Sequence, residues 1–430
     1  MFKKIAAVVL AVLMMVSITA AFTGCSGGAS ADFKVGVILI GDETEGYSKA
    51  HMDGIKEAAK GLGIADNQII WKYKVEENST CLDAATDLVG QGCDLIISNS
   101  YGHQTYMVQA AEQFPDITFA SMTGDFAAIS GVPNLKNGFT KVFQSRYVSG
   151  VVAGMKVAEL LANGTISESA TPEHFDSNGN VKIGYVGAFD YAEVVSGYTA
   201  FFLGIRSVVE NVTMEINYTS SWFDIDKEAA AAEALIANGC VIIGQHADST
   251  GAPSATQKAL DEGKICYSVG YNIDMLATAP TAAHTSPTNT WSVFYTELMK
   301  TVIDGGDFPA DVAYGYENGG VAITTLGPSC AAGTAEKVAE VEAALKDGSL
   351  KVFDTSSFTV SADQNTCTVT TDADGHVTSC IIDTSFMDWS TMTPIYQGEQ
   401  VECIVDGAFD ESTIRSAPYF SIRIDGIIEK

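Results

Sequence analysis

Short apolar runs that end abruptly in polar residues mark the predicted strands of this chain. Segment 92–102 begins with a glycine and a cysteine, continues through the apolar residues 95–97 and becomes polar at Ser98. An apolar run without alternation is typical of a parallel strand buried on both faces. Because open α/β sheets bind ligands at the carboxyl ends of their strands, we expect residues 98–103 to lie at a binding rim.

The same pattern occurs a second time, about half the protein further along the chain. Segment 239–248 repeats the glycine, the cysteine, the apolar run and the polar end, and segment 181–185 resembles segment 33–37. Helix-forming segments lie between the strands of both copies. Two copies of a βαβαβ plan predict an α/β protein with two similar Rossmann-like lobes whose rims face each other. A cleft between such lobes is suited to holding a small molecule.

The order of the elements predicts how the chain divides. We expect lobe 1 at residues 33–145 and lobe 2 at residues 146–275. Residues 276–312 are predicted to return to lobe 1 and residues 313–360 to lobe 2, with a hinge between the lobes. Residues 361–430 are rich in Ser, Thr and Asp that alternate with apolar residues, which predicts a small β-rich C-terminal extension.

The first residues predict export. Two lysines precede an apolar run over residues 5–21, and small residues follow it up to Cys25. This order is typical of a secretion signal and resembles a bacterial lipoprotein signal, in which the cysteine becomes the lipid-modified first residue. We expect a signal peptide at residues 1–24, a linker at residues 25–32 and a body held at the extracytoplasmic face of the cell membrane. The alternative is an uncleaved membrane anchor.

Charge and motifs exclude several classes of function. The formal net charge of −29 argues against a nucleic-acid partner. The glycines form no dinucleotide fingerprint and no Gly-Lys-Ser phosphate loop occurs, so we expect no nucleotide cofactor. Ser249 follows His246 and Asp248 but lacks the glycine-flanked elbow of a nucleophile, so we expect a binding protein and no enzyme.

Cysteines predict no metal site, because no spacing resembles that of a zinc ligand set. Eight cysteines remain once Cys25 is assigned to lipid, and Cys367 and Cys380, which flank a predicted hairpin, are the best candidates for a disulfide. Four others lie in predicted core segments, where free buried thiols are expected.

Aromatic and polar residues at the two predicted rims are the candidate ligand-binding residues. His51 lies one helical turn beyond Tyr47, and it either bonds the ligand or is a structural histidine. Asn99 and Tyr101 alternate, so their side chains point to opposite faces, and we prefer Asn99. The remaining candidates on lobe 2 and the crossover are Phe189, Trp222, Asp224, Gln245, His246, Asp248, Asn272 and Asp274.

Four of the candidates on lobe 2 and the crossover have a structural alternative. Asp248 either accepts paired hydroxyls of a sugar or caps the helix that follows, and Asp224 is either a ligand-binding residue or a helix cap. Asn272 and Asp274 lie at a predicted crossover, where hinge and ligand roles are both open.

These residues form an ordered series that resembles the BMP family, the basic membrane lipoprotein group of ABC-transporter substrate-binding proteins that includes bacterial purine-nucleoside receptors. The resemblance covers most of residues 33–389 and rests on segments 46–51, 98–102, 114–116, 146–150, 221–224, 245–249 and 270–275. It implies a type I periplasmic-binding-protein fold whose lobes close on a solute. The expected partners are then a small-molecule ligand, a membrane permease and a cytoplasmic ATPase.

The resemblance also implies roles for single residues. In purine-binding members an aromatic residue of the first loop stacks on the base, and Tyr47 stands at the matching position. Ser48 replaces the asparagine that usually follows. The aromatic residue of lobe 2 is either Phe189 or Trp222. The resemblance favours a purine nucleoside as the ligand; the alternative is a sensor for a sugar or an autoinducer-like ligand that signals through a membrane partner.

Overall fold

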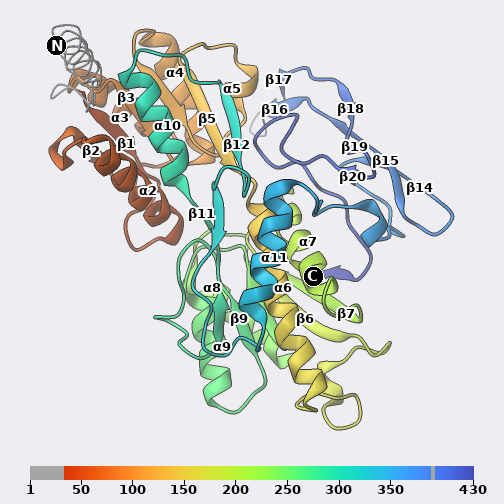
Figure 1. Ribbon diagram of the computed structural model, residues 1–430. Helices are drawn as coiled ribbons and strands as arrows, with labels where there is room; N and C mark the ends of the chain where they lie inside the picture. The colour runs from red at the N-terminus through yellow and green to blue at the C-terminus, as the bar shows by residue number, and fades with distance from the viewer. Residues whose placement is uncertain (1–32, 389–392) are drawn as a thin grey trace, which may run out of the picture.

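The computed structural model describes residues 33–388 and 393–430 (Figure 1). The predicted signal peptide and the whole predicted linker, including Cys25, lie outside the described residues. Within the described ranges, none of the helices combines the length and the apolar character needed to cross a bilayer.

Two six-stranded parallel sheets form the centres of the two lobes. The sheet of lobe 1 has the strand order β12-β5-β4-β3-β1-β2, with β1 Val35–Ile38, β2 Ile69–Lys72, β3 Leu95–Ser98, β4 Thr118–Ser121, β5 Leu135–Thr140 and β12 Asp311–Tyr314. The sheet of lobe 2 has the order β10-β9-β8-β6-β7-β21, with β6 Val181–Gly187, β7 Val212–Tyr218, β8 Ile242–Gln245, β9 Tyr267–Val269, β10 Ala283–Thr285 and β21 Ile427–Glu429. The predicted α/β fold with two parallel-sheet lobes is confirmed.

Helices cover the faces of both sheets (Figure 1). They are α2 Gly46–Leu62, α3 Ser79–Gly90, α4 Gln104–Gln113, α5 Phe126–Ile129, α6 Val142–Ala162, α7 Ala192–Arg206, α8 Ile225–Ala237, α9 Gly251–Asp261, α10 Trp291–Ile303 and α11 Thr334–Asp347. Strand β3 is buried along its whole length, as its unbroken apolar run predicts. Helix α2 begins after Glu45, whose carboxylate accepts the N–H groups of Tyr47 and Ser48, and ends at Gly63 with φ of 72°.

The chain passes between the lobes more than once. Strand β10 pairs with β9, so residues that we expected on lobe 1 from position 276 still belong to the sheet of lobe 2. Strand β11 (Pro287–Asn289) then pairs with β13 (Val321–Ile323). Return to lobe 1 begins with α10, whose apolar residues join the core of that lobe. The reason is local, because the short strand β10 adds to the edge of the lobe 2 sheet, next to β9, before the chain crosses.

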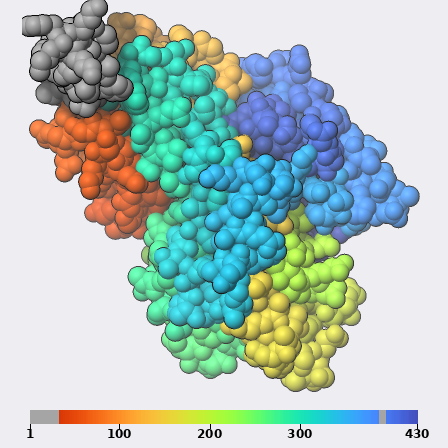
Figure 2. All heavy atoms as spheres, in the orientation of Figure 1, coloured from red at the N-terminus to blue at the C-terminus, as the bar shows by residue number. Residues whose placement is uncertain are grey.

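The C-terminal extension consists of short antiparallel strands beside the lobes, drawn in blue (Figures 1 and 2). They are β14 Thr368–Thr371, β15 Val377–Asp383, β16 Phe386–Asp388, β17 Thr393–Tyr396, β18 Gln400–Glu402, β19 Ile404–Val405 and β20 Ala408–Phe409. The rings of Phe353 and Phe420 stack with centroids 4.1 Å apart and belong to the apolar core of lobe 2.

All eight cysteines in the described part of the chain are free thiols. The predicted disulfide between Cys367 and Cys380 is therefore not present. In the hairpin, the residue paired with Cys380 is Val369 and not Cys367. Cys81, Cys93 and the other two predicted core cysteines are buried thiols, as expected.

Helices α6 and α7 pack closely at two glycines. A Cβ atom added at Gly150 would lie 2.1 Å from the carbonyl oxygen of Phe201, and one added at Gly204 would lie 2.1 Å from that of Tyr147. Backbone atoms at this distance cannot move aside without separating the helices.

We therefore expect Gly150→Ala to lower the free energy of unfolding by about 1–3 kcal/mol. Gly61→Ala is the matched control, because no atom lies within 4 Å of its added Cβ and alanine is favoured over glycine in a helix by up to about 1 kcal/mol. Urea denaturation of both variants checks this. Equal midpoints for Gly150→Ala and the wild-type protein would contradict the packing argument.

Candidate functional site

The rims of the two sheets touch at the start of α2. A Cβ atom at Gly46 would lie 3.1 Å from the carbonyl oxygen of Asp248, and the next nearest atoms belong to Ile273. Gly46 follows the first strand of lobe 1, whereas Asp248 follows β8 of lobe 2. The lobes are therefore closed on each other at the place where the sequence predicts the ligand.

Tyr47 is fixed at the rim of lobe 1 by its hydroxyl group. The hydroxyl donates to the carbonyl oxygen of Asn99 and lies 2.9 Å from the hydroxyl of Thr123. Burial raises the pKa of Tyr47 well above its usual range, so the phenol stays protonated. Thr123 has φ of 58°, which places it in a tight turn after β4.

His51 lies behind Tyr47 in the core of the lobe. Its ring stacks on Trp291 at 4.2 Å, meets the Tyr47 ring edge-on at 4.5 Å, and its Nδ1 lies 2.6 Å from the Tyr295 hydroxyl. Burial lowers the pKa of His51 to about 3, so the ring is neutral. These contacts support the structural alternative for His51.

Strand β3 ends at Ser98, before Asn99 and Tyr101, and Asn99 is occupied within the protein. Its amide oxygen accepts the Ile40 N–H at 2.9 Å, and its amide nitrogen donates to the Ser48 hydroxyl at 3.1 Å. Asn99 thus holds the loop that carries Tyr47. Tyr101 begins a short 3₁₀ helix and is half exposed.

Three aromatic residues form one cluster at the rim of lobe 2. The rings of Phe189 and Tyr191 stack at 5.2 Å, and Trp222 lies 5.3 Å from Phe189. The two alternatives given by the sequence therefore belong to the same surface. Tyr191 is 57% exposed and was not among the residues predicted from the sequence. The signal for it is an aromatic residue two positions after Phe189, in the polar segment that follows β6 and precedes α7.

Asp248 is the central carboxyl group of the site. It accepts a hydrogen bond from the Asn272 amide at 2.7 Å and does not cap α9, whose N-cap is Thr250. Burial and then the charges of Glu45, Glu228 and Glu193 raise the pKa of Asp248 well above its usual range. Burial likewise raises the pKa of Glu228 to about 7.

The other acidic and amide candidates have internal partners. Asp224 caps α8 by accepting the Lys227 N–H at 3.0 Å, which supports its structural alternative. Asp274 is exposed and accepts the Leu276 N–H at 2.8 Å. Gln245 donates to the carbonyl oxygens of Ala247 and Ser249 at 2.7 and 3.0 Å.

Asn272 joins the site to the hinge. Its φ is 62°, and its amide oxygen accepts a hydrogen bond from Asn289 at 3.0 Å. Asn289 in turn accepts from the hydroxyl of Thr140, at the end of β5 in lobe 1. Asn272 therefore contacts both Asp248 and Asn289, which lies in the connection between the lobes.

His246 and Arg146 lie below the rim of lobe 2. His246 is fully buried, with Nε2 3.4 Å from Glu193, and burial followed by the charge of Arg146 lowers its pKa to about 4. The Arg146 guanidinium donates to the Tyr185 hydroxyl at 2.6 Å and the Gln245 carbonyl at 2.7 Å. It also lies 3.9 Å over the Tyr271 ring. Arg146 belongs to segment 146–150, which carries the family resemblance, but it was not among the candidate ligand-binding residues predicted from the sequence.

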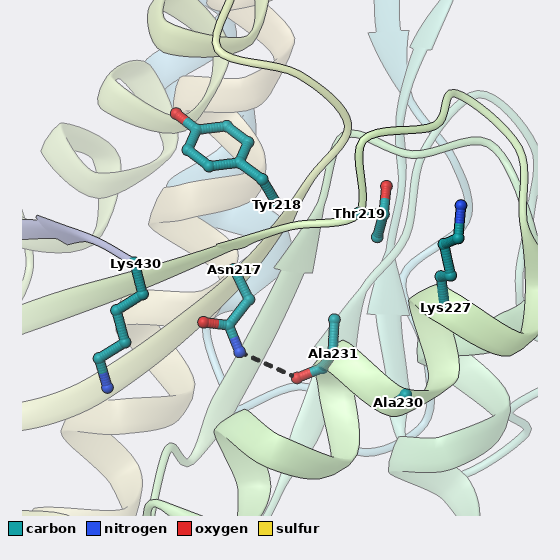
Figure 3. A pocket seen from close by; sticks show the side chains of 7 residues that line it. All are labelled: Asn217, Tyr218, Thr219, Lys227, Ala230, Ala231 and Lys430. Atoms are coloured by element: carbon teal, nitrogen blue, oxygen red, sulfur yellow. Dashed lines mark hydrogen bonds between the residues drawn. The ribbon is translucent and has the colours of Figure 1, made fainter.

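A surface pocket of ≈ 410 Å³ lies where β7 and β21 end (Figure 3). Its two lysines are engaged, because Lys227 pairs with Asp224 at 3.3 Å and Lys430 pairs with Glu215 at 2.5 Å. The Asn217 amide donates to the Ala231 carbonyl. With its polar groups occupied, this pocket is a weaker candidate than the rims. Among the described residues there is no group of side chains arranged to hold a metal ion.

Comparisons with known proteins agree on the class of protein. A family model described as ABC transporter substrate-binding protein PnrA-like matches residues 35–348. A purine-binding protein of Brucella abortus is 30% identical over 344 residues, which are 79% of this chain and 89% of that protein. A Haloferax volcanii protein named for an ABC transporter and for glucose binding is 29% identical over 63% of this chain and 62% of its own length.

Solved structures show the same fold. An ABC transporter solute-binding protein from Conexibacter woesei superposes with a TM-score of 0.58 at 19% identity, covering 74% of this chain and 98% of that chain. A solute-binding protein of Aeropyrum pernix has a TM-score of 0.58 at 16% identity, covering 75% and 93%.

Buried His246 predicts a pH dependence of stability. In the folded protein it stays neutral down to about pH 4, whereas in the unfolded chain it takes up a proton near pH 6.5. The unfolded state therefore binds more protons as the pH falls through this window, and the free energy of unfolding falls by about 1.4 kcal/mol per pH unit. His246→Gln removes this contribution.

We expect the loss of stability between about pH 7.5 and about pH 5 to be about 2 kcal/mol smaller in His246→Gln than in the wild-type protein. Urea denaturation at both pH values measures it. The same loss in both proteins would show that His246 is protonated in the folded state.

Proposed function

Because the chain belongs to the family of PnrA-like ABC transporter substrate-binding proteins, we propose that it binds a purine nucleoside between its two lobes and delivers it to an ABC importer. As a member of this family it is an extracytoplasmic solute-binding protein and not an enzyme, and it has the type I periplasmic-binding-protein fold. The nature of the ligand and the lipid on Cys25 belong to the proposal.

The observation that carries the proposal is the presence of aromatic residues on both sides of the contact between the lobes. Tyr47 follows Gly46, which touches Asp248, and the Asp248 N–H donates to the Trp222 carbonyl at 2.8 Å. These backbone contacts bring the positions of Tyr47 and Trp222 to the same junction of the lobes, which supports a planar ligand held between aromatic residues of both lobes. Stacking contributes about 1–3 kcal/mol per base.

The charges of the site favour a nucleoside over a nucleotide. The carboxyl groups of Glu45, Glu228 and Glu193 are close enough to Asp248 to raise its pKa. A phosphate would add negative charge among these carboxyl groups, which is unfavourable in a buried site. A ligand with hydroxyl groups offers them hydrogen-bond donors.

The alternative ligand is a sugar, either imported or sensed. The relative from Haloferax volcanii is named for glucose binding. A sugar would depend on the carboxyl group of Asp248 more than on stacking, so mutation of the aromatic residues separates the two cases.

A thermal-shift screen identifies the ligand class. We expect the protein from Ser26 onward, refolded to remove bound ligand, to melt at a higher temperature with adenosine, guanosine or inosine. A ligand at a concentration of about 100 times its Kd adds about 2.7 kcal/mol to the free energy of unfolding. Free bases, pentoses and hexoses complete the panel, and a response to sugars alone would contradict the nucleoside proposal.

Tyr47→Ala tests the stacking contact. We expect the Kd for the best nucleoside to rise tenfold or more, because about 1.4 kcal/mol corresponds to a factor of ten. Tyr396→Ala is the control, since Tyr396 is an exposed tyrosine on β17 of the C-terminal extension. Isothermal titration calorimetry measures both, and an unchanged Kd for Tyr47→Ala would exclude a stacking role.

Cys25→Ser tests the lipid anchor. In a bacterial host fed radioactive palmitate, we expect the wild-type protein to be labelled and to sediment with membranes, because a buried acyl chain contributes about 0.8 kcal/mol per CH₂. The Cys25→Ser variant should carry no label. Equal labelling of the two proteins would place any lipid elsewhere.

A further inference from the structure

The C-terminal extension is attached to lobe 2 at both of its ends. Phe353, which precedes the extension, lies in the apolar core of lobe 2 and stacks on Phe420 of the extension. At its end, β21 pairs with β7, and the carboxylate of Glu429 accepts the hydroxyl groups of Tyr198 and Tyr218 at 2.5 and 2.7 Å. The extension therefore moves together with lobe 2.

Between these two attachments the chain forms a compact loop. The buried carboxylate of Glu411 accepts the N–H groups of Tyr419 and Phe420, both at 2.8 Å. It also accepts the N–H of Ser412 at 3.2 Å. Burial raises the pKa of Glu411 to about 7, and these bonds from backbone N–H groups stabilise its ionised form. They hold residues 411–420 as a loop whose middle is residues 415–416.

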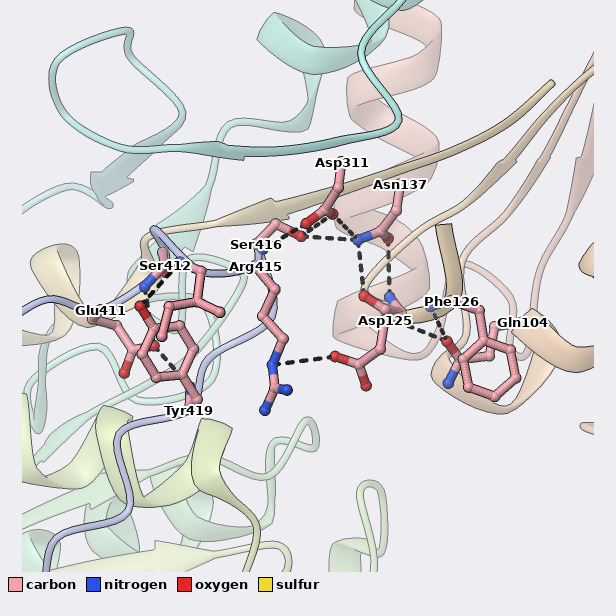
Figure 4. Close-up of polar contacts among 12 residues, drawn as sticks. Gln104, Asp125, Phe126, Asn137, Asp311, Glu411, Ser412, Arg415, Ser416 and Tyr419 are labelled. Carbon is pink, nitrogen blue, oxygen red and sulfur yellow. Dashed lines mark hydrogen bonds and ion pairs between the residues drawn. The ribbon is translucent and has the colours of Figure 1, made fainter. Parts of the chain in front are cut away.

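Residues 415–416 contact lobe 1 (Figure 4). The Ser416 N–H donates to Asp311 at 2.7 Å, and its hydroxyl accepts from the Asn137 amide at 2.8 Å. The Arg415 side chain points toward Asp125, with Nε 3.6 Å from the carboxylate. Asp311 and Asn137 lie on the paired strands β12 and β5 of lobe 1.

The same residues of lobe 1 also hold the turn that positions Tyr47. Asn137 holds both backbone groups of Gly124, donating to its carbonyl at 2.8 Å and accepting its N–H at 3.0 Å. Gly124 follows Thr123, whose hydroxyl lies 2.9 Å from that of Tyr47. One asparagine therefore binds both the extension and the turn that positions Tyr47.

We propose that residues 415–416 are an interlobe latch: carried by lobe 2, they bind Asp125, Asn137 and Asp311 of lobe 1 and thereby hold the lobes closed and the Tyr47 turn in place. Opening of the lobes separates lobe 1 from the extension and breaks these contacts. A latch that favours the closed state raises the fraction of molecules competent to bind, and the apparent Kd falls in proportion. The family model ends at residue 348, so the latch lies in a part of the chain outside that match.

Small-angle X-ray scattering of the full chain from Ser26 onward, without ligand, tests the latch directly. We expect the double variant Arg415→Met, Ser416→Ala to have a larger radius of gyration than the wild-type protein, because its lobes open. Asp125→Asn removes the carboxylate that Arg415 faces on lobe 1, and it should also increase the radius of gyration. A cooperative thermal melt confirms that each variant is folded.

Arg423→Met is the matched control. Arg423 also pairs with carboxylates, but both of them, Asp190 and Glu429, lie on the side of lobe 2. Its loss should lower stability without changing the radius of gyration. A latch variant with the wild-type radius, or a control that opens as much as the latch variants, would overturn the proposal.

Binding gives a second readout that rests on the proposed function. With the nucleoside that gives the largest thermal shift, we expect the latch variant to bind about tenfold more weakly. Scattering in the absence of ligand does not depend on the nature of the ligand. A failed ligand screen therefore overturns the nucleoside proposal alone, whereas unchanged scattering overturns the latch alone.

Discussion

The close approach of Gly46 to the carbonyl oxygen of Asp248 is the contact on which the arrangement of the site depends. Any larger residue at position 46 would place its Cβ 3.1 Å from a backbone atom of the opposite lobe, so that the junction would have to shift by a few tenths of an ångström. Because Gly46 begins the helix that carries Tyr47, this contact also sets how closely Tyr47 approaches lobe 2. Aromatic and carboxyl groups from both lobes thus lie within one closed site.

Closure of the lobes removes several ionisable groups from water. The free-energy cost of burying their charges is reduced in different ways. The carboxyl groups of Asp248 and Glu228 have raised pKa values, so protonation reduces their charge. The Arg146 guanidinium is stabilised by two oxygen acceptors and the face of Tyr271. His246 stays neutral. The site is polar yet carries less charge than its composition suggests.

The two lobes were predictable because the signal is local. Unbroken apolar runs such as that of β3 identify buried parallel strands, and the polar residue after each run identifies the rim. Side-chain roles were less predictable, because they depend on register and on distant partners. Asn99 looks available in the sequence but bonds Ile40 and Ser48, and Asn137 meets Ser416 across 279 residues of chain. The hydrophobic periodicity of a sequence carries no information about such contacts between distant residues.

The strand order also determines when each lobe is complete. Both sheets take an edge strand from far along the chain, β12 in lobe 1 and β21 in lobe 2, and Glu429 of β21 is 211 residues away from its partner Tyr218. Until β21 arrives, β7 presents unpaired backbone groups at the edge of its sheet. In a chain that emerges from its amino end, lobe 1 can be finished after residue 314, while lobe 2 waits for β21 at the end of the extension. Folding of the second lobe therefore draws the extension into place, so that the two mature as one unit.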